Sequence, residues 1–523
     1  MSGIHGADAG DLRGTGGGGG TADAGDLTSF WAETALIGGS VQERVRIAGT
    51  IGSRALAGTI TAIETGVEPR AGEQKLDTVL PGFANAHSHA FHRVLRGRTH
   101  DDGGDFWQWR TQMYRVAGLL DPESYRALAT AVFAEMVTSG FTAVGEFHYV
   151  HHRPDGSPYT AHAMEQALAG AAADSGIRLT LLDTCYLTGG IGLPLSAAQR
   201  RFGDGGGGDD GGGGDADGDA GRWLERWHSL RDALAPTALL GAALHSVRAV
   251  PREAIRRIVR ELPSGVPLHV HLSEQPQENT DCLEAYGLTP TGLLAEAGLL
   301  ERLSVVHATH LTDDDIRMLG EAGSTVVMCP STEADLGDGI GPARALADAG
   351  ARIALGSDQN AVIDPLLECR GLEAGARLAS GRRGRFTPAE LAIAASSDGY
   401  RSLGLAPRGA GRRLADAAAT DAEGLGAGRP GGPGERGPAA RDRSSDAATD
   451  AGGLRVGAPF DLVELDSAST RTAGSRPAQL LLTATAADVR TVVVGGTVRA
   501  RSGVLADGRH PAALLAAALE GLS

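Results

Sequence analysis

The sequence is poor in several features that mark particular classes of protein. Its 523 residues include only four cysteines, and none of them forms a CxxC pair. This excludes a disulfide-rich secreted scaffold and predicts reduced thiols. There is no run of 18 apolar residues, and the first residues lack a basic stretch followed by an apolar one. We therefore expect a cytoplasmic protein with neither a membrane span nor a secretory signal.

Basic residues are also scarce, with 48 Lys and Arg against 64 Asp and Glu and a net charge of -16. No basic stripe interleaved with aromatic residues occurs, so nucleic acid is not an expected partner. Residues 203–221 contain six Asp and no base, and residues 1–26 contain four Asp against Arg13. Much of the negative charge thus lies in segments of simple composition, where it indicates solubility rather than a basic partner.

Glycine, in contrast, is abundant: the chain has 77, roughly twice the usual share. Many of these lie in segments without hydrophobic periodicity. Such composition predicts a disordered tail over 1–29, a disordered insertion at 203–221 and a low-complexity insertion at 408–452.

From residue 78 to about residue 400, short apolar runs alternate with helical patterns, which is typical of repeated βα units. Asp121-Pro122 and Pro251 are helix-start signals between these runs. The eight strand candidates are 78–87, 142–148, 178–186, 238–245, 267–272, 304–307, 325–329 and 352–356. This rhythm predicts a (β/α)8 TIM barrel over 78–400, an α/β fold with its active site at the carboxyl ends of the strands. An open doubly wound sheet would need a glycine-rich phosphate loop after the first strand, and none is present.

The flanking regions do not follow this rhythm. Residues 30–77 and 455–505 contain short β-rich runs separated by turn residues. Because these runs lie on either side of the barrel region in sequence, they predict a small β-sandwich domain formed from both chain ends.

Candidate metal ligands follow several of the predicted strands. In His87-x-His89 the two side chains point the same way along a strand, so both can reach one ion. A single His-x-His pair is weak evidence, because a buried core histidine is as common. His271, His307 and Asp358, however, also stand at strand ends, and imidazoles with one carboxylate suit zinc or a similar ion.

These residues, with Glu274 three positions after His271, resemble the amidohydrolase superfamily in its mononuclear deaminase branch. The resemblance implies a metal-bearing (β/α)8 barrel with a small β-sandwich. It also implies one divalent ion, Zn²⁺ before others, held by His87, His89, His271 and Asp358. Glu274 would transfer protons, and His307 and Asp358 would complete the catalytic set.

Longer motifs resemble one family within this branch, the formimidoylglutamate deiminases of histidine degradation. They are Phe106 to Arg110, Glu146 to His152, His245 to Arg248 and Cys329 to Gly339. The resemblance implies hydrolysis of N-formimino-L-glutamate to N-formyl-L-glutamate and ammonia. It assigns substrate contacts to His92, Arg110, Tyr149, His245 and Arg248. His92 departs from the family, which has Gln at this position.

Other functions stay open. A related deaminase acting on guanine or another aminated heterocycle would need aromatic stacking instead of two arginines. A catalytically dead homologue used as a scaffold would lack a ligand or Glu274, yet all are present. The expected partner is a small molecule with two carboxylates, and a homodimer is possible.

Overall fold

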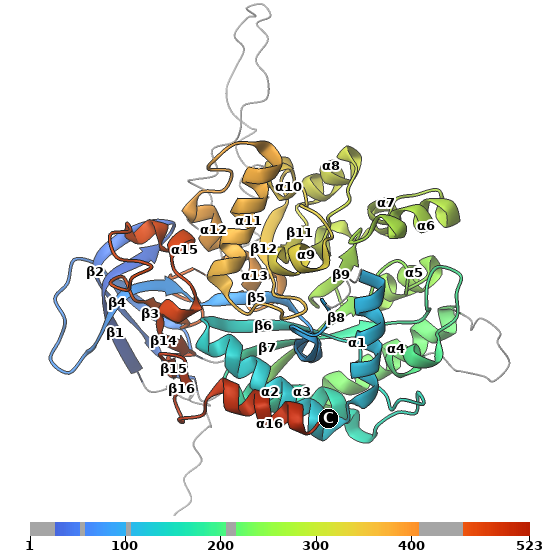
Figure 1. Cartoon of the computed structure of the whole chain (residues 1–523), viewed down its shortest axis with the longest axis horizontal. Coiled ribbons are helices and arrows are strands. Elements are labelled where there is room, and N and C mark those ends of the chain that lie inside the picture. Colours follow the sequence, from blue (N-terminus) through green and yellow to red (C-terminus); the bar gives the residue numbers. More distant parts are fainter. Residues whose placement is uncertain (1–26, 53–57, 101–105, 205–215, 407–452, 523) are drawn as a thin grey trace, which may run out of the picture.

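Two eight-stranded sheets organise the protein (Figure 1). The computed structural model describes residues 27–52, 58–100, 106–204, 216–406 and 453–522. In this part of the chain no helix is long and apolar enough to cross a membrane.

One of the two sheets forms the barrel. Its eight strands are all parallel and follow one another in sequence order. Its strands are β5 (Phe83–Ser88), β6 (Phe141–His148), β7 (Arg178–Cys185), β8 (Ala238–Leu244), β9 (Leu268–Leu272), β10 (Leu303–His307), β11 (Thr325–Met328) and β12 (Arg352–Leu355). The predicted fold class is therefore confirmed, and each predicted strand has its counterpart.

Helices cover the outside of the barrel (Figure 1). Those between β5 and β9 are α1 (Phe106–Leu119), α2 (Pro122–Thr138), α3 (Ala163–Ser175), α4 (Ala216–Ala233) and α5 (Arg252–Glu261). The later ones are α6 (Pro276–Tyr286), α7 (Pro290–Glu296), α8 (Asp313–Ala322), α9 (Pro330–Leu336), α10 (Ala343–Ala349), α11 (Pro365–Ser380), α12 (Pro388–Ala395) and α13 (Ser397–Ser402). The start signal of α2 is confirmed, since the Asp121 side chain accepts a hydrogen bond from Ser124 N.

The amino-terminal end of the barrel is closed by α13. Its Tyr400 hydroxyl lies 2.7 Å from Thr142 Oγ1 of β6, and the carbonyl of the following Leu403 accepts a hydrogen bond from Thr180 of β7. His269 of β9 lies 3.0 Å from the Ser402 carbonyl. Because this end is filled, the opposite, carboxyl-terminal end is the one that can receive a ligand.

Both chain ends build the other sheet, as predicted. Its order is β16-β15-β14-β13-β4-β1-β2-β3. The strands are β1 (Leu27–Ile37), β2 (Ser40–Thr50), β3 (Ile60–Glu64), β4 (Gln74–Pro81), β13 (Leu462–Leu465), β14 (Val489–Val494), β15 (Thr497–Arg501) and β16 (Val504–Leu505). A bridge between Thr59 and Pro459 brings the β3 edge back toward β13, so the sheet curls around its own core. Helix α15 (Leu480–Thr483) lies between β13 and β14, and α16 (Pro511–Glu520) follows β16 and packs on α2.

Three predicted boundaries differ from the structure. Strand β1 begins at Leu27, inside the expected tail 1–29. The apolar run 78–87 is not one strand, because β4 ends in the curled sheet at Pro81 and β5 starts the barrel at Phe83. Residues 216–221, predicted as disordered, form the first turns of α4, where Asp219 and Ala220 are buried. Residues 1–26, 205–215 and the whole of 408–452 lie outside the described residues.

A buried ion pair joins the barrel to the curled sheet. Arg178 of β7 donates two hydrogen bonds to Asp461, from Nε at 2.6 Å and from Nη2 at 2.9 Å, and both side chains are buried. Asp461 also accepts hydrogen bonds from the Tyr400 hydroxyl at 2.5 Å and from Gly495 N at 2.7 Å. One carboxylate thus ties together a barrel strand, the helix that closes the barrel and the loop after β14.

Replacing Asp461 by Ala is expected to lower the free energy of unfolding by about 3–5 kcal/mol, because the Arg178 charge stays buried without its partner. Chemical denaturation followed by circular dichroism measures this. The control is Arg317→Ala, which removes an exposed ion pair with Glu321 and should cost under about 1 kcal/mol. Equal effects of the two substitutions would contradict the assigned role of Asp461.

Candidate metal centre and active-site cavity

Four side chains converge at the carboxyl-terminal end of the barrel. His87 Nε2 lies 3.1 Å from His271 Nε2 and 3.3 Å from Asp358 Oδ1. His89 Nε2 lies 3.4 Å from His271 Nε2 and 3.5 Å from the same Asp358 oxygen. All four residues are buried. The predicted ligands are therefore brought together from β5, β9 and the turn after β12.

The backbone orients two of these imidazoles. His89 Nδ1 lies 2.8 Å from the Phe147 carbonyl, and His271 Nδ1 lies 2.9 Å from the His245 carbonyl. A carbonyl accepts only from a protonated nitrogen, so Nδ1 carries the proton and Nε2 keeps a free lone pair. This is how metal-binding histidines are usually held.

The donor set fits a zinc-sized ion. Burial lowers the pKa values of His87, His89 and His271, so their imidazoles are neutral, and three lone pairs then face one another. Burial opposes ionisation of Asp358, but the close approach of His87 and the other nearby histidines holds its pKa well below the usual range. A tetrahedral site with bonds of about 2.0–2.1 Å separates its ligands by about 3.4 Å. The observed spacings of 3.1–3.5 Å match that value.

Three strand ends turn through left-handed backbone at this point. Ser273, His307 and Asp358 have φ values of 47°, 67° and 43°. Non-glycine residues adopt this conformation rarely, and it costs about 1–3 kcal/mol at each position. Such strain is concentrated at functional sites, which fits its occurrence at the ends of β9, β10 and β12.

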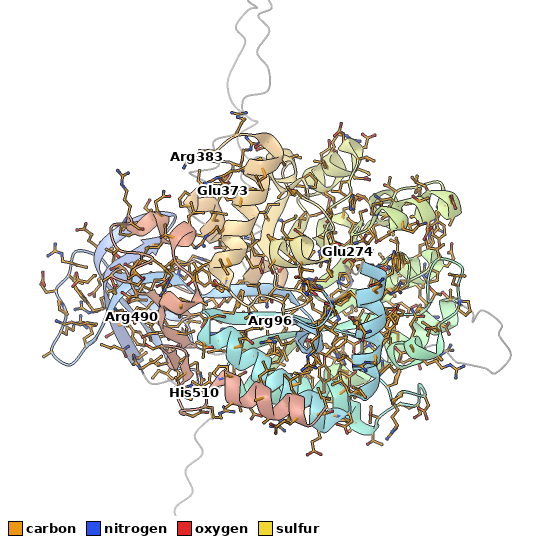
Figure 2. The ribbon with its side chains drawn as sticks, viewed as in Figure 1. Arg96, Glu274, Glu373, Arg383, Arg490 and His510 are labelled. Carbon is orange, nitrogen blue, oxygen red and sulfur yellow. The ribbon has the colours of Figure 1, made fainter. Side chains whose placement is uncertain are left out.

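Glu274 and His307 lie beside the donors. Their Oε1 and Nε2 atoms are 3.8 Å apart, and His307 Nε2 is 3.9 Å from Asp358 Oδ2. Burial raises the pKa of the Glu274 carboxyl. Burial opposes protonation of His307, but Glu274, Glu333 and Asp358 overcome it and raise the pKa of His307 to about 10. Glu274 lies near α1 in Figure 2, and Glu274 and several residues of α1 line the same cavity.

All five predicted substrate contacts line this cavity: His92, Arg110, Tyr149, His245 and Arg248. His92 Nε2 lies 2.9 Å from the Tyr149 hydroxyl. The Arg110 guanidinium lies 5.5 Å from the Trp107 ring centre and 5.3 Å from that of Tyr114. Cationic and aromatic groups thus line the same cavity as Glu274, His307 and Asp358.

Several residues of the site were not predicted from the sequence. Glu333 of α9 lies 3.6 Å from His307 Nδ1, and Tyr186 after β7 lines the cavity. Asn85 accepts a hydrogen bond from Ser357 N, and Asn360 donates to the His89 carbonyl. The only available signals were that Glu333 lies in the Cys329 to Gly339 motif and that Asn85 and Asn360 lie two residues from His87 and Asp358.

A second histidine cluster has a different character. His148 and His151 lie 3.3 Å and 2.9 Å from Glu165 Oε1, close enough to suggest another ion. However, Arg226 Nη1 lies 3.3 Å from that oxygen and 2.7 Å from Asp183 Oδ2. The guanidinium supplies the positive charge, so this cluster is a buried hydrogen-bond network that packs α3 and α4 against the barrel.

The chain is similar to known proteins in both sequence and structure. The model of the amidohydrolase family matches residues 78–420. Formimidoylglutamate deiminase of Pseudomonas aeruginosa is 35% identical over 69% of this chain and 77% of its own length. The 8-oxoguanine deaminase of the same organism is 32% identical over 64% of this chain and 70% of its own. A crystal structure of an amidohydrolase from Brucella melitensis is 29% identical, covers 95% of this chain and 99% of its own, and superimposes with a TM-score of 0.75.

Replacing His271 by Ala is expected to reduce the bound metal by about tenfold or more, because one of four donors is lost. Plasma mass spectrometry of the purified protein measures the metal, and circular dichroism checks the fold. His310→Ala is the control, because His310 follows the same strand as His307 but is not one of the clustered donors. Undiminished metal in His271→Ala would exclude the assigned donor set, and wild-type protein purified without any metal would favour the scaffold alternative.

Proposed function

Because the chain belongs to the amidohydrolase family, we propose that it hydrolyses N-formimino-L-glutamate to N-formyl-L-glutamate and ammonia in histidine degradation. It is a hydrolase acting on a carbon–nitrogen bond. The observation that carries the substrate assignment is the pair of arginines, Arg110 and Arg248, in the cavity that also contains Glu274 and the metal donors.

The two arginines match a substrate with two carboxylates. Guanidinium groups bind carboxylates through two parallel hydrogen bonds, so each arginine can take one. In the described part of the chain Arg110 has no carboxylate partner, which leaves its charge for a ligand. Tyr149, His92 and His245 add hydrogen-bonding groups to the lining of the same cavity. The formimino group then points toward Glu274, where the chemistry takes place.

His87, His89, His271 and Asp358 would hold one divalent ion, with zinc best suited to this nitrogen and oxygen set. When bound, such an ion lowers the pKa of water to about 7 and so makes a nucleophile available at neutral pH.

Glu274 is the proton carrier in this scheme. Its carboxylate takes a proton from the attacking water and passes it to the formimino nitrogen, which leaves a tetrahedral carbon bearing a hydroxyl and an amino group. Glu274 then moves the hydroxyl proton to the amino group, so that the C–N bond breaks and ammonia leaves. The carbon gains oxygen and becomes the formyl carbonyl. His307, whose surroundings favour its protonated form, donates a hydrogen bond to the oxygen as negative charge develops there. Asp358 holds His307 close, at 3.9 Å.

One observation supports a second candidate, deamination of an aminated heterocycle. Phe106, Trp109, Tyr149 and Tyr186 line the cavity and could stack on a flat ring, and the relative from Pseudomonas aeruginosa named 8-oxoguanine deaminase is 32% identical. A neutral heterocycle offers no carboxylate to either guanidinium group, which makes it the weaker candidate.

The substrate assignment predicts that ammonia is released from N-formimino-L-glutamate and not from guanine or 8-oxoguanine. Arg110→Met and Arg248→Met should each lower kcat/KM by about 30-fold or more, mainly through KM, since each removes a charged hydrogen-bond partner. Arg115→Met is the matched control, because Arg115 is exposed on the same helix as Arg110. Release of ammonia from a purine only, or full turnover in both variants, would refute the assignment.

The proton-transfer role of Glu274 predicts that Glu274→Gln lowers kcat by about 10²–10⁴-fold while leaving the bound metal unchanged. Steady-state kinetics and metal analysis on the same sample separate the two effects. A variant that keeps more than about one tenth of the wild-type kcat would show that another group moves the proton.

A further inference from the structure

A buried carboxylate lies behind one of the two arginines. Glu278 is on α6, and its side chain is fully enclosed at 0% exposure. Its Oε2 lies 3.5 Å from Nε of Arg248, which is the only ion pair of either residue in the described part of the chain. The Ser273 backbone N–H helps to stabilise this carboxylate, but in the same part neither oxygen of Glu278 has a hydrogen-bond partner in good geometry, and neither has Nε of Arg248.

Burial of this carboxylate lowers the stability of the fold, which points to a functional role for Glu278. Burying a carboxylate without hydrogen bonds destabilises a protein unless a nearby charge compensates. Burial raises the pKa of Glu278 to about 7, and Arg248 opposes that rise. An apolar residue at position 278 would avoid the cost, and so the carboxylate has a use other than stability.

We propose that Glu278 is a positioning residue that fixes the Arg248 guanidinium where a substrate carboxylate can bind it and prevents it from pairing with Glu274. The proposal rests on the function inferred above. It names the residue that keeps Arg248 available for a substrate carboxylate.

Local geometry supports this role. Glu274 and Glu278 are four residues apart where α6 begins, and Glu278 N donates a hydrogen bond to the Gln275 carbonyl at 3.1 Å. Both carboxylates are electrostatic neighbours of Arg248. Without Glu278, Glu274 would become the main anion acting on this arginine. An Arg248–Glu274 pair would occupy both the carboxylate-binding group and the proton carrier before substrate arrives.

Arg110 is held in another way. Its guanidinium lies against the Trp107 and Tyr114 rings and is hydrogen bonded to the hydroxyls of Tyr114 and Tyr186. Aromatic faces and hydroxyls fix a guanidinium without neutralising it. Arg110 therefore needs no carboxylate behind it, whereas Arg248, with no side-chain hydrogen bond in the described part of the chain, depends on Glu278.

A double-mutant cycle with the metal-loaded full-length enzyme tests this dependence. The variants are Glu278→Ala, Arg248→Met and the two combined, with Glu278→Gln as the conservative replacement. Glu284→Ala is the control, because Glu284 is exposed on the same helix. The readouts are kcat and KM for N-formimino-L-glutamate, the Kd of N-formyl-L-glutamate from calorimetry, and metal content.

Glu278→Ala is expected to lower kcat/KM by about tenfold or more and to weaken product binding similarly. In the Arg248→Met background the same change should alter kcat/KM by less than about twofold, because the residue through which it acts is gone. Glu278→Gln keeps an oxygen next to Arg248 and should stay within about threefold of wild type. Glu284→Ala should leave every readout unchanged.

Equal losses from Glu278→Ala in both backgrounds would show a purely structural role and overturn the proposal, as would no loss in either. Suppose that wild-type protein turns over N-formimino-L-glutamate but the effects of the Glu278 and Arg248 substitutions simply add. That result would overturn this inference and leave the proposed function intact. Wild-type protein that neither turns over that substrate nor binds N-formyl-L-glutamate would overturn the proposed function and this inference together.

Discussion

Three main-chain hydrogen bonds close the barrel, and the site depends on them. His89 N donates to the Asp358 carbonyl at 2.9 Å, while Asp358 N and Ser357 N donate to the His87 carbonyl at 3.0 Å and 3.1 Å. These bonds join the first strand to the turn after the last. The residues that they join include His87, His89 and Asp358, three of the four proposed metal donors. Sheet closure therefore fixes the separation of the donor side chains before any ion binds, because a parallel pairing leaves the backbone little freedom.

The cavity above this closure has an uneven distribution of charge. Glu274, Glu333 and Asp358 surround His307, whereas Arg110 and Arg248 line the cavity, and in the described part of the chain the one ion pair of these two arginines joins Arg248 to Glu278. The electric field of these charges orients a molecule that is negative at one end and can carry a proton at the other. In a buried site the effective dielectric constant is lower, so such orientation is stronger than it would be on the surface.

Much of this architecture follows from local sequence patterns, and some of it does not. The barrel could be predicted because each strand is a short apolar run, and the candidate donors because each stands at or near the end of such a run; the choice of four among them came from the family resemblance and stays a proposal. The run from Thr78 to His87 was predicted as one strand because apolar residues continue on both sides of Pro81-Gly82, the dipeptide at which the chain passes from one sheet to the other. A side chain at Gly82 would meet Thr142 and Asp461, contacts that only the folded chain creates. Glu278 escaped prediction for a related reason: its position four residues after Glu274 is typical of any exposed helix, and only packing shows that it is enclosed.

The ion pair between Arg178 and Asp461 also limits how the protein can be divided. The two residues are separated by 283 positions in sequence, and Asp461 holds Gly82 through its carbonyl, at the entry to the first barrel strand. An expression fragment restricted to the barrel would leave a buried guanidinium exposed at its base and would free the strand that carries His87 and His89. The curled sheet is therefore part of the minimal catalytic unit, and any circular permutation or domain exchange in this chain has to keep it.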